Sequence, residues 1–336
     1  MPTLAELTTL RVGGPARDLV TATSEADLID AVASADDSGT PVLLLGGGSN
    51  LVVSDDGFDG TVVRIATRGI DLAAIDSCGG VMVTVAAGEP WDSFVAHAVA
   101  NGWAGVEALA GIPGLTGATP VQNVGAYGQE VAATIARVRT WDREAGEVRT
   151  FANVACDFGY RTSRFKHAHR WVVLDVTFQL RPGALSEPVR YGELARALGA
   201  EVGGRVALTD VPPAVLALRR AKGMVLDPAD HDTWSAGSFF TNPVLDTVPE
   251  GAPSWPADGG LKTSAAWLIE QSGYGRGYPG DDAAVALSGK HTLALSNRGG
   301  GCAADVVGLA REIRAGVERR FGVTLMPEPR LVGLAL

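Results

Sequence analysis

The chain has 336 residues, 46% of them hydrophobic, and a formal net charge of −10 at pH 7. This length allows substantial apolar cores divided over two or three domains, and the negative charge argues against general binding to nucleic acid or anionic membranes. No apolar run approaches the ~20 residues that span a bilayer, and the N-terminus lacks a basic region followed by an apolar stretch. We therefore expect a cytoplasmic globular protein.

The first half of the chain predicts mixed α+β structure that is βαβ-like only locally. Helices are expected at residues 24–36, with Ser24 as N-cap, and at 91–100. Apolar or β-branched runs predict strands, which we place at 42–45, 62–65, 81–86, 137–141, 148–151 and 171–180. The strands at 137–141 and 148–151 flank a short turn and predict a hairpin.

The composition changes after Pro182, and we place a domain boundary between residues 182 and 210. A helix opened by proline is expected after Thr209-Asp210, and a further helix at 264–271. The last helix, at 305–321, has an apolar stripe at helical spacing, formed by Val306, Leu309, Ile313 and Val317.

The cysteines and histidines give no sign of a metal site. Cys78, Cys156 and Cys302 are odd in number and far apart, which predicts neither a disulfide framework nor a C-x-x-C motif. His167 and His169 would share one face of a strand, but the other three histidines form no companion motif. We therefore expect no bound metal.

Two glycine-rich runs predict close approach of the backbone to another group. Residues 111–130 contain glycine, proline and neutral polar residues but no Lys or Arg, and residues 46–48 are three glycines that follow an apolar strand. Main-chain N–H groups in tight turns hold a diphosphate without lysine, and Tyr127 could lie against a ring. The spacing is neither the Rossmann fingerprint nor a P-loop. A loop crossing between sheets remains the alternative for 111–130.

Several polar residues occupy positions suited to chemistry, each with a structural alternative. Ser238 lies between a glycine and two phenylalanines without a G-x-S-x-G motif, which favours a proton or hydrogen-bond donor over acyl transfer. Prolines on both sides restrain Glu328, and Lys222 follows a helix end. The cluster at 161–170 holds four of the 28 basic residues. The structural alternatives are a turn serine for Ser238 and a surface turn for Glu328. For Lys222 the alternative is a helix cap, and for the 161–170 cluster it is a solvated basic edge.

Six segments, in this order, resemble the UDP-N-acetylenolpyruvoylglucosamine reductase family of bacterial cell-wall precursor enzymes. They are Thr9–Ala16, 46–53, 111–130, Gly159–Ser163, Gly237–Phe240 and Pro327–Arg330. The resemblance spans nearly the whole chain, and its specificity lies in the joint occurrence of the segments rather than in any one of them.

The resemblance implies an α+β protein with an FAD-binding module of the vanillyl-alcohol-oxidase (PCMH) type. This module comprises two α+β subdomains, at residues 1–66 and 67–208, followed by an α+β substrate-binding domain at 209–336, whose last strand is free to return to the FAD module. Both glycine-rich runs then face non-covalent FAD. The cofactor-binding residues implied are Gly46, Gly47, Gly48, Ser49, Asn50, Leu51, Gly111, Ile112, Pro113, Gly114, Gly117, Ala118, Gln122, Asn123, Gly125, Ala126, Tyr127 and Gly128.

The same resemblance implies a reaction in which NADPH reduces the flavin. The flavin then passes hydride to C3 of UDP-N-acetylglucosamine enolpyruvate, giving UDP-N-acetylmuramate for peptidoglycan. Hydride at C3 leaves negative charge on C2 and the carboxylate, which requires stabilisation and a proton source. The family motifs place Ser238 as proton donor to C2, with Arg161 and Glu328 at the carboxylate. Glu328 is then either protonated or bridged by Arg161.

Substrate binding falls by resemblance to Tyr191, Lys222 and Asn242, with Lys262 nearby. Tyr191 matches the subgroup in which a tyrosine-bearing loop covers the substrate. Thr241 departs from members that have lysine there, which puts a phosphate contact from that position in doubt. We expect a monomer. One alternative is an oxidase or dehydrogenase with the same FAD module. Such relatives often attach FAD covalently through histidine or cysteine, and neither residue occurs in 46–53 or 111–130. The other alternative is a non-catalytic nucleotide-sugar-binding protein.

Overall fold

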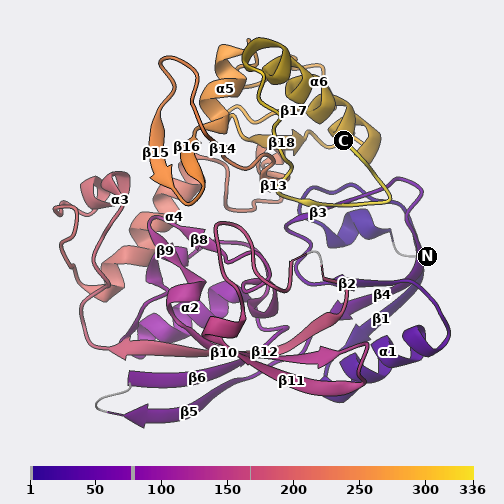
Figure 1. Cartoon of the computed structure of the whole chain (residues 1–336), viewed down its shortest axis with the longest axis vertical. Helices are drawn as coiled ribbons and strands as arrows, with labels where there is room; N and C mark the ends of the chain where they lie inside the picture. The colour runs from indigo at the N-terminus through magenta and orange to yellow at the C-terminus, as the bar shows by residue number, and fades with distance from the viewer. Residues whose placement is uncertain (1–2, 77–79, 167) are drawn as a thin grey trace. The chain divides into compact units, whose positions relative to one another are not determined.

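The computed structural model describes residues 3–76, 80–166 and 168–336, so Cys78 and His167 lie outside the described residues. The chain divides into two compact units (Figure 1). The larger unit comprises Asp18–Gly47 and Gly60–Arg220, and the smaller unit comprises Met1–Arg17, Gly48–Asp59 and Ala221–Leu336. Each unit is therefore assembled from segments that lie far apart in the sequence.

A three-stranded sheet and one helix form the first layer of the larger unit. The sheet has the order β1-β4-β2, with bounds Ala16–Ala22, Phe58–Ile65 and Val42–Leu45, and β2 and β4 are parallel. Helix α1 (Glu25–Asp37) begins with a capping box between Ser24 and Asp27. The helix predicted at 24–36 and the strand at 42–45 are confirmed. Leu28 and Val32 of α1 are fully buried and pack in one cluster with Val63.

The main sheet of the larger unit is antiparallel and has the strand order β11-β10-β12-β6-β5, as Figure 1 shows. The strands are Glu147–Ala152, Ile135–Asp142, Trp171–Pro182, Gly80–Ala86 and Ile70–Asp76, with β7 (Trp103–Ala104) paired to β12. The predicted hairpin is confirmed as β10–β11. Helix α2 (Trp91–Ala100) matches its predicted bounds, and its Trp91 and Phe94 pack on Phe178 of β12 with ring centroids 5.9 and 4.8 Å away.

Short elements complete the larger unit and carry its loops. They are β8 (Gly125–Ala126), β9 (Gln129–Glu130), α3 (Gly192–Ala197), α4 (Val211–Ala221), and the 3-10 helices at Glu107–Leu109, Thr116–Ala118, Val131–Ala133, Asn153–Ala155 and Leu208–Asp210. The proline-opened helix predicted after Thr209-Asp210 is confirmed as α4, which runs into the start of the smaller unit.

Over its described residues, the smaller unit contains three small sheets and two α-helices. Its parallel pair joins β3 (Leu51–Val53) to β19 (Arg330–Val332). The antiparallel sheets are β13-β18-β17 (Ser235–Ser238, Ala294–Asn297, Val285–Leu287) and β14-β16-β15 (Val244–Leu245, Gly260–Thr263, Ser254–Ala257). Short 3-10 helices lie at Leu4–Leu7 and His231–Thr233. Helix α5 (Ala265–Gln271) is capped by the Ser264 side chain.

Helix α6 (Ala303–Phe321) closes the core of the smaller unit. All four residues of its predicted apolar stripe are buried. The carboxylate of Asp55 accepts hydrogen bonds from the backbone nitrogens of Ala303 and Ala304 at 2.8 and 3.0 Å, which satisfies two free donors of the first turn. Among the described residues, no helix combines the length and apolar character needed to cross a membrane.

Two glycines of α6 allow a matched stability test. A Cβ on Gly316 would lie 2.6 Å from Cζ of Tyr274, whereas a Cβ on Gly308 meets no atom within 4 Å. We expect Gly316→Ala to lower the free energy of unfolding by ~1–3 kcal/mol through overpacking. Gly308→Ala should raise it by ~0.5–1 kcal/mol, because alanine favours the helix. Urea unfolding measures both, and a stabilising Gly316→Ala would contradict the packing described.

Candidate active site

Gly47 of the first glycine-rich run meets the 111–130 run within the larger unit. A Cβ on Gly47 would lie 2.7 Å from Cα of Gly114, and one on Gly117 would lie 2.8 Å from Cα of Ala87. Real Cβ atoms do not approach backbone atoms this closely, so both positions require glycine. The sequence presented these runs as separate clusters, and the fold places Gly47 directly against the other run.

Side chains from two helices fix the start of the 111–130 run. The Gly111 N–H donates to Oδ1 of Asp92 in α2 at 2.7 Å, and the Gly111 carbonyl accepts from Nε of Arg219 in α4 at 3.1 Å. Arg219 is only 8% exposed, and this burial lowers the pKa of its guanidinium. Sequence reasoning missed both side chains, because their link to Gly111 spans 19 and 108 positions.

The end of the run contacts the segment that carries Tyr191. The rings of Tyr127 and Tyr191 are edge-to-face, with centroids 5.6 Å apart and planes at 88°. A Cβ on Gly128 would lie 2.9 Å from Cβ of Arg190. Tyr191 is the N-cap residue of α3 and is 47% exposed. A predicted cofactor residue and a predicted substrate residue therefore lie side by side.

Arg161 lies in a tight turn of the larger unit. Backbone hydrogen bonds join Gly159 and Thr162 in both directions, at 3.1 and 3.3 Å, and Arg161 has a left-handed φ of 53°. Its guanidinium donates to the carbonyl of Gly125 at 2.9 Å and to that of Asn123 at 3.5 Å. The predicted catalytic arginine is thus attached to the predicted cofactor run, and its side chain is partly exposed.

Ser238 and Glu328 are brought together in the smaller unit. The backbone N–H of Glu328 donates to the carbonyl of Phe239 at 2.8 Å, and Phe240 forms a bridge with Pro327. Asn50 joins them, because its Nδ2 donates to the Glu328 carbonyl at 3.3 Å while its own carbonyl accepts from the Arg330 N–H at 2.9 Å. Both predicted catalytic side chains are partly exposed, so they are accessible to a ligand.

The other predicted substrate residues of the smaller unit lie on or near the β14-β16-β15 sheet. Lys262 of β16 lies directly opposite Val244 of β14 and Trp255 of β15. Opposed residues of antiparallel strands share a face, so Lys262 stands between two apolar side chains that are 37% and 48% exposed. Sequence reasoning did not single out Trp255, which lies in the Pro- and Gly-rich stretch at 249–260.

Asn242, Thr241 and Lys222 have more local surroundings. Oδ1 of Asn242 accepts from the Ala265 N–H at 2.9 Å, so the side chain is oriented by the first turn of α5. The Thr241 hydroxyl donates to the Met326 carbonyl at 3.3 Å. Lys222 directly follows α4 and is partly buried.

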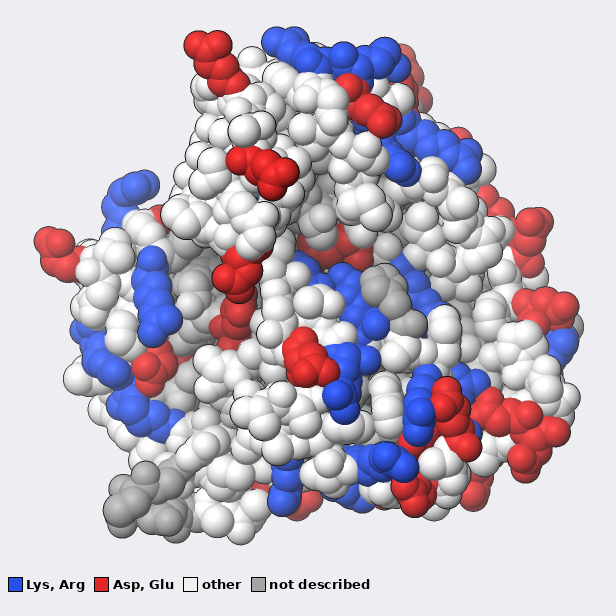
Figure 2. Space-filling view, viewed as in Figure 1, with Lys and Arg blue, Asp and Glu red and all other residues white. Residues whose placement is uncertain are grey.

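The basic cluster at 161–170 divides into separate structural contacts. Arg164 pairs with Asp157 at 2.9 Å, Arg170 pairs with Asp142 at 2.6 Å, and Lys166 donates to the Arg161 carbonyl at 2.6 Å. Figure 2 shows acidic and basic side chains intermixed over the region of α1 and the β10–β11 hairpin. The cluster is therefore mainly a paired, solvated edge.

Asp142 at the turn of this hairpin should make stability depend on acid pH. The Arg170 hydrogen bond, helped by the N–H groups of Ala145 and Glu144, lowers the pKa of Asp142 from 3.8 to about 2. Because the pKa of Asp142 is lower in the folded than in the unfolded protein, ionised Asp142 contributes fully to the free energy of unfolding above pH ~4. This contribution is lost as the pH falls toward the pKa of the folded protein. The difference in urea midpoint between wild type and Asp142→Asn should therefore shrink between pH 5 and pH 2.5. A constant difference would contradict this linkage.

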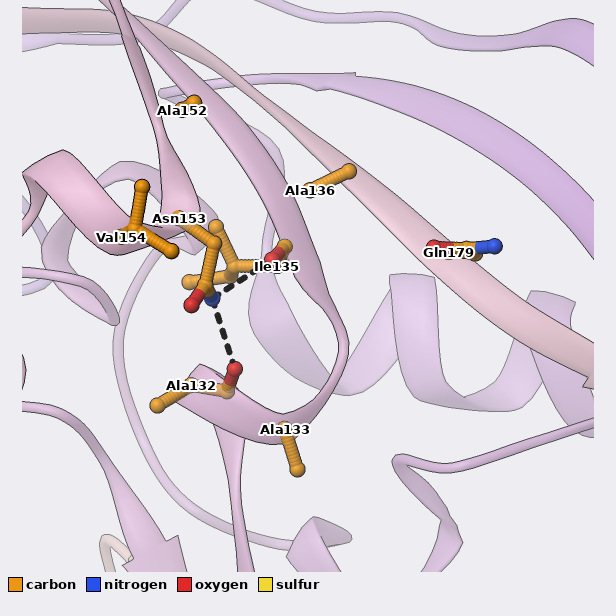
Figure 3. A pocket seen from close by; sticks show the side chains of 8 residues that line it. All are labelled: Ala132, Ala133, Ile135, Ala136, Ala152, Asn153, Val154 and Gln179. Atoms are coloured by element: carbon orange, nitrogen blue, oxygen red, sulfur yellow. Dashed lines mark hydrogen bonds between the residues drawn. The ribbon is translucent and has the colours of Figure 1, made fainter.

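A surface hollow of the larger unit adjoins Asn123, because the N–H of its lining residue Ala132 donates to Oδ1 of Asn123 at 3.1 Å. Figure 3 shows it lined by alanine, isoleucine and valine side chains of 132–136 and 152–154, with Asn153 and Gln179. None of the lining residues is a predicted site residue. In the described part of the chain, no group of three His, Cys, Asp or Glu side chains could hold a metal ion.

The residues present fit FAD. The runs at 46–51 and 111–128 pack closely on neighbouring protein atoms at Gly47 and Gly117, and Gly47, Ala118 and Gly128 are exposed. Their polar side chains are neutral, which suits a large anionic cofactor bound by main-chain donors. Gly48, Gly111, Gly114 and Gly128 also have φ between 63° and 125°, a region that glycine adopts at little cost.

Adjacent glycines give a test of this cradle. We expect Gly47→Ala to lower both the melting temperature of the apoprotein and its affinity for FAD, because the new methyl meets the Gly114 backbone. Gly46→Ala is the matched control, since its Cβ would meet only Leu115 at 3.6 Å. It should leave the apoprotein's stability unchanged, within the ±0.5 kcal/mol usual for a sterically tolerated change. Flavin fluorescence titration and thermal unfolding separate the two, and equal behaviour would contradict the proposed contact.

Comparisons with known proteins identify the domains and the relatives of this chain. The FAD binding domain family matches residues 16–152, and the C-terminal domain family of UDP-N-acetylenolpyruvoylglucosamine reductase matches residues 227–332. The chain is 59% identical to the UDP-N-acetylenolpyruvoylglucosamine reductase of Cutibacterium acnes over 99% of this chain and 90% of that protein. Identity to the Salinispora arenicola enzyme of the same name is 56%, covering 99% and 95%.

The fold and the glycine cradle together define a flavoprotein oxidoreductase with a PCMH-type FAD module. A crystal structure of UDP-N-acetylenolpyruvylglucosamine reductase from Thermus caldophilus aligns with a TM-score of 0.69 at 25% identity, covering 98% of this chain and 97% of that one. The chain belongs to the UDP-N-acetylenolpyruvoylglucosamine reductase family. The predicted fold class and the FAD cofactor are confirmed.

Proposed function

We propose that the chain reduces UDP-N-acetylglucosamine enolpyruvate to UDP-N-acetylmuramate, with NADPH as hydride donor. The proposed overall reaction, its place in peptidoglycan synthesis, and the use of FAD and NADPH are supported by membership of the family. The residue roles rest on one observation above all, the hydrogen bond from the Glu328 N–H to the Phe239 carbonyl. It holds Glu328 beside the residue that follows Ser238.

The glycine-rich runs at 46–51 and 111–128 would hold FAD, which would supply the hydride chemistry between NADPH and C3 of the substrate when bound. Ser238 donates a proton to C2, because a hydroxyl is acidic enough for a strongly basic, enolate-like carbon within hydrogen-bond reach. Arg161 binds the substrate carboxylate and stabilises the charge that develops beside it. Glu328 acts on the same side, either protonated or bridged by Arg161.

Tyr191, Lys222, Asn242 and Lys262 bind the diphosphate side of the substrate. The two lysines supply local positive charge that the overall charge of −10 does not. The contact of Tyr191 with Tyr127 supports a tyrosine-bearing loop that covers the substrate, and the exposed Trp255 beside Lys262 offers an apolar surface to the nucleotide. We further propose a monomer in which residues 209–336 bind the substrate and 1–66 and 67–208 bind FAD.

Anaerobic mixing tests the function directly. Purified protein is mixed with NADPH and then with UDP-N-acetylglucosamine enolpyruvate while flavin absorbance near ~450 nm is followed, because the flavin reports each half-reaction. Bleaching followed by recovery is the expected result. Bleaching without recovery would refute the substrate, and a protein that binds no flavin would refute the whole assignment.

A further inference from the structure

Asn123 is a buried junction within the larger unit. It is 2% exposed and has a left-handed φ of 46°. Its Nδ2 donates to Oε2 of Glu130 at 3.0 Å and to the Gly159 carbonyl at 3.1 Å, while its Oδ1 accepts from the Ala132 N–H at 3.1 Å. Both amide hydrogens are therefore used inside the protein, so this side chain is not a donor to FAD.

Asn123 contacts both the turn that carries Arg161 and the Arg161 guanidinium. The side chain holds the Gly159 carbonyl, which closes the turn that carries Arg161. The backbone carbonyl of Asn123, with that of Gly125, accepts from the Arg161 guanidinium. A single residue of the predicted cofactor run thus holds the base and the tip of the predicted catalytic arginine.

We propose that Asn123 is a positioning residue that sets the orientation of Arg161 for recognition of the substrate carboxylate. The inference rests on the role proposed above for Arg161. A guanidinium binds a carboxylate well only when its planar donors are aimed correctly. Fixing both the turn and the guanidinium lowers the conformational freedom that Arg161 would otherwise lose when substrate binds.

The chain contains a matched control for loss of a buried asparagine. Asn153 also uses both amide hydrogens, donating to the carbonyls of Ala132 and Ile135 at 2.8 Å each, as Figure 3 shows. Ala132 is thus held from one side by Asn123 and from the other by Asn153. No hydrogen bond recorded for Asn153 in the described residues involves the Arg161 turn.

The experiment compares Asn123→Gly with Asn153→Gly in the FAD-loaded protein. Glycine keeps the left-handed backbone accessible at position 123. Calorimetric titration measures binding of UDP-N-acetylmuramate, which has the carboxylate, and of UDP-N-acetylglucosamine, which lacks it. We expect Asn123→Gly to weaken the first about 10- to 100-fold, the scale of a hydrogen bond to a charged group, and to leave the second unchanged. Asn153→Gly should lower the melting temperature alone.

A double-mutant cycle with Arg161→Ala identifies the route of the effect. If Asn123 acts through Arg161, then Asn123→Gly should add less than about twofold in the Arg161→Ala background. Additive losses, equal weakening of both ligands, or the same ligand effect from Asn153→Gly would each overturn the inference. If Asn123→Gly does not fold, Asn123→Asp is measured together with Glu130→Gln. Aspartate tolerates this backbone and lacks the donated hydrogens, and the glutamine avoids a second carboxylate beside it.

The single Arg161→Ala variant separates this inference from the proposed function. If Arg161→Ala leaves the preference for the carboxylate-bearing ligand intact, then the role of Arg161 is wrong and the inference falls with it. If Arg161→Ala removes the preference but Asn123→Gly does not, then only the positioning role of Asn123 is refuted.

Discussion

Ser238→Ala is expected to slow reoxidation of the flavin by UDP-N-acetylglucosamine enolpyruvate by ~10²-fold or more, the scale of losing a positioned acid. Reduction of the flavin by NADPH should proceed at the wild-type rate, because the hydroxyl is needed only when C2 is protonated. Anaerobic stopped-flow measurement of the two half-reactions gives both rates separately. The contrast between them distinguishes loss of a proton donor from general damage.

Ser235→Ala is the control for this variant. Ser235 lies on the same strand as Ser238, is 8% exposed, and its hydroxyl accepts from the Gly237 N–H at 3.2 Å. Its loss removes a hydroxyl of local structural use, so both half-reactions should change little and to the same extent. An equal slowing of both half-reactions in Ser238→Ala would assign Ser238 the same structural role and remove it from catalysis.

Arg161→Ala is likewise expected to spare flavin reduction and to slow the second half-reaction by ~10²-fold or more, the scale of removing one donor to developing negative charge. The affinity for the enolpyruvyl substrate should fall as well, because the guanidinium is proposed to bind its carboxylate before and during the reaction. Single-turnover rates measured over a range of substrate concentrations separate the binding effect from the rate effect.

Arg164→Ala is the matched control for the arginine. Arg164 is three positions away and pairs with Asp157 at 2.9 Å, with its side chain 33% exposed. Arg164→Ala also removes the contact of the guanidinium with the Phe151 ring, 4.7 Å from its centroid. Together these losses should cost ~1–2 kcal/mol of stability and leave both half-reactions unchanged. Unaltered turnover in Arg161→Ala would place Arg161 outside the site, and loss of turnover in both variants would indicate damage to the whole basic edge.

The local elements and the family could be predicted from the amino-acid sequence. Helix α1 with its Ser24 cap, helix α2 and the buried stripe of α6 follow from spacing and capping within a few residues, so their positions could be predicted. The order of six short motifs also indicated the FAD module and the reductase family, which the comparisons confirm. Periodicity and motif order are carried by the chain itself and require no tertiary contact.

Which of these segments meet depends on long-range contacts in the folded chain. Asn50 and Glu328 are 278 positions apart, and their contact depends on parallel pairing of β3 with β19. Arg219 reaches Gly111 across 108 positions, and Asn123 reaches Gly159 across 36. Hydrogen bonds between such distant groups leave no periodic trace in the sequence. They form because buried polar groups must find partners wherever the folded chain brings them.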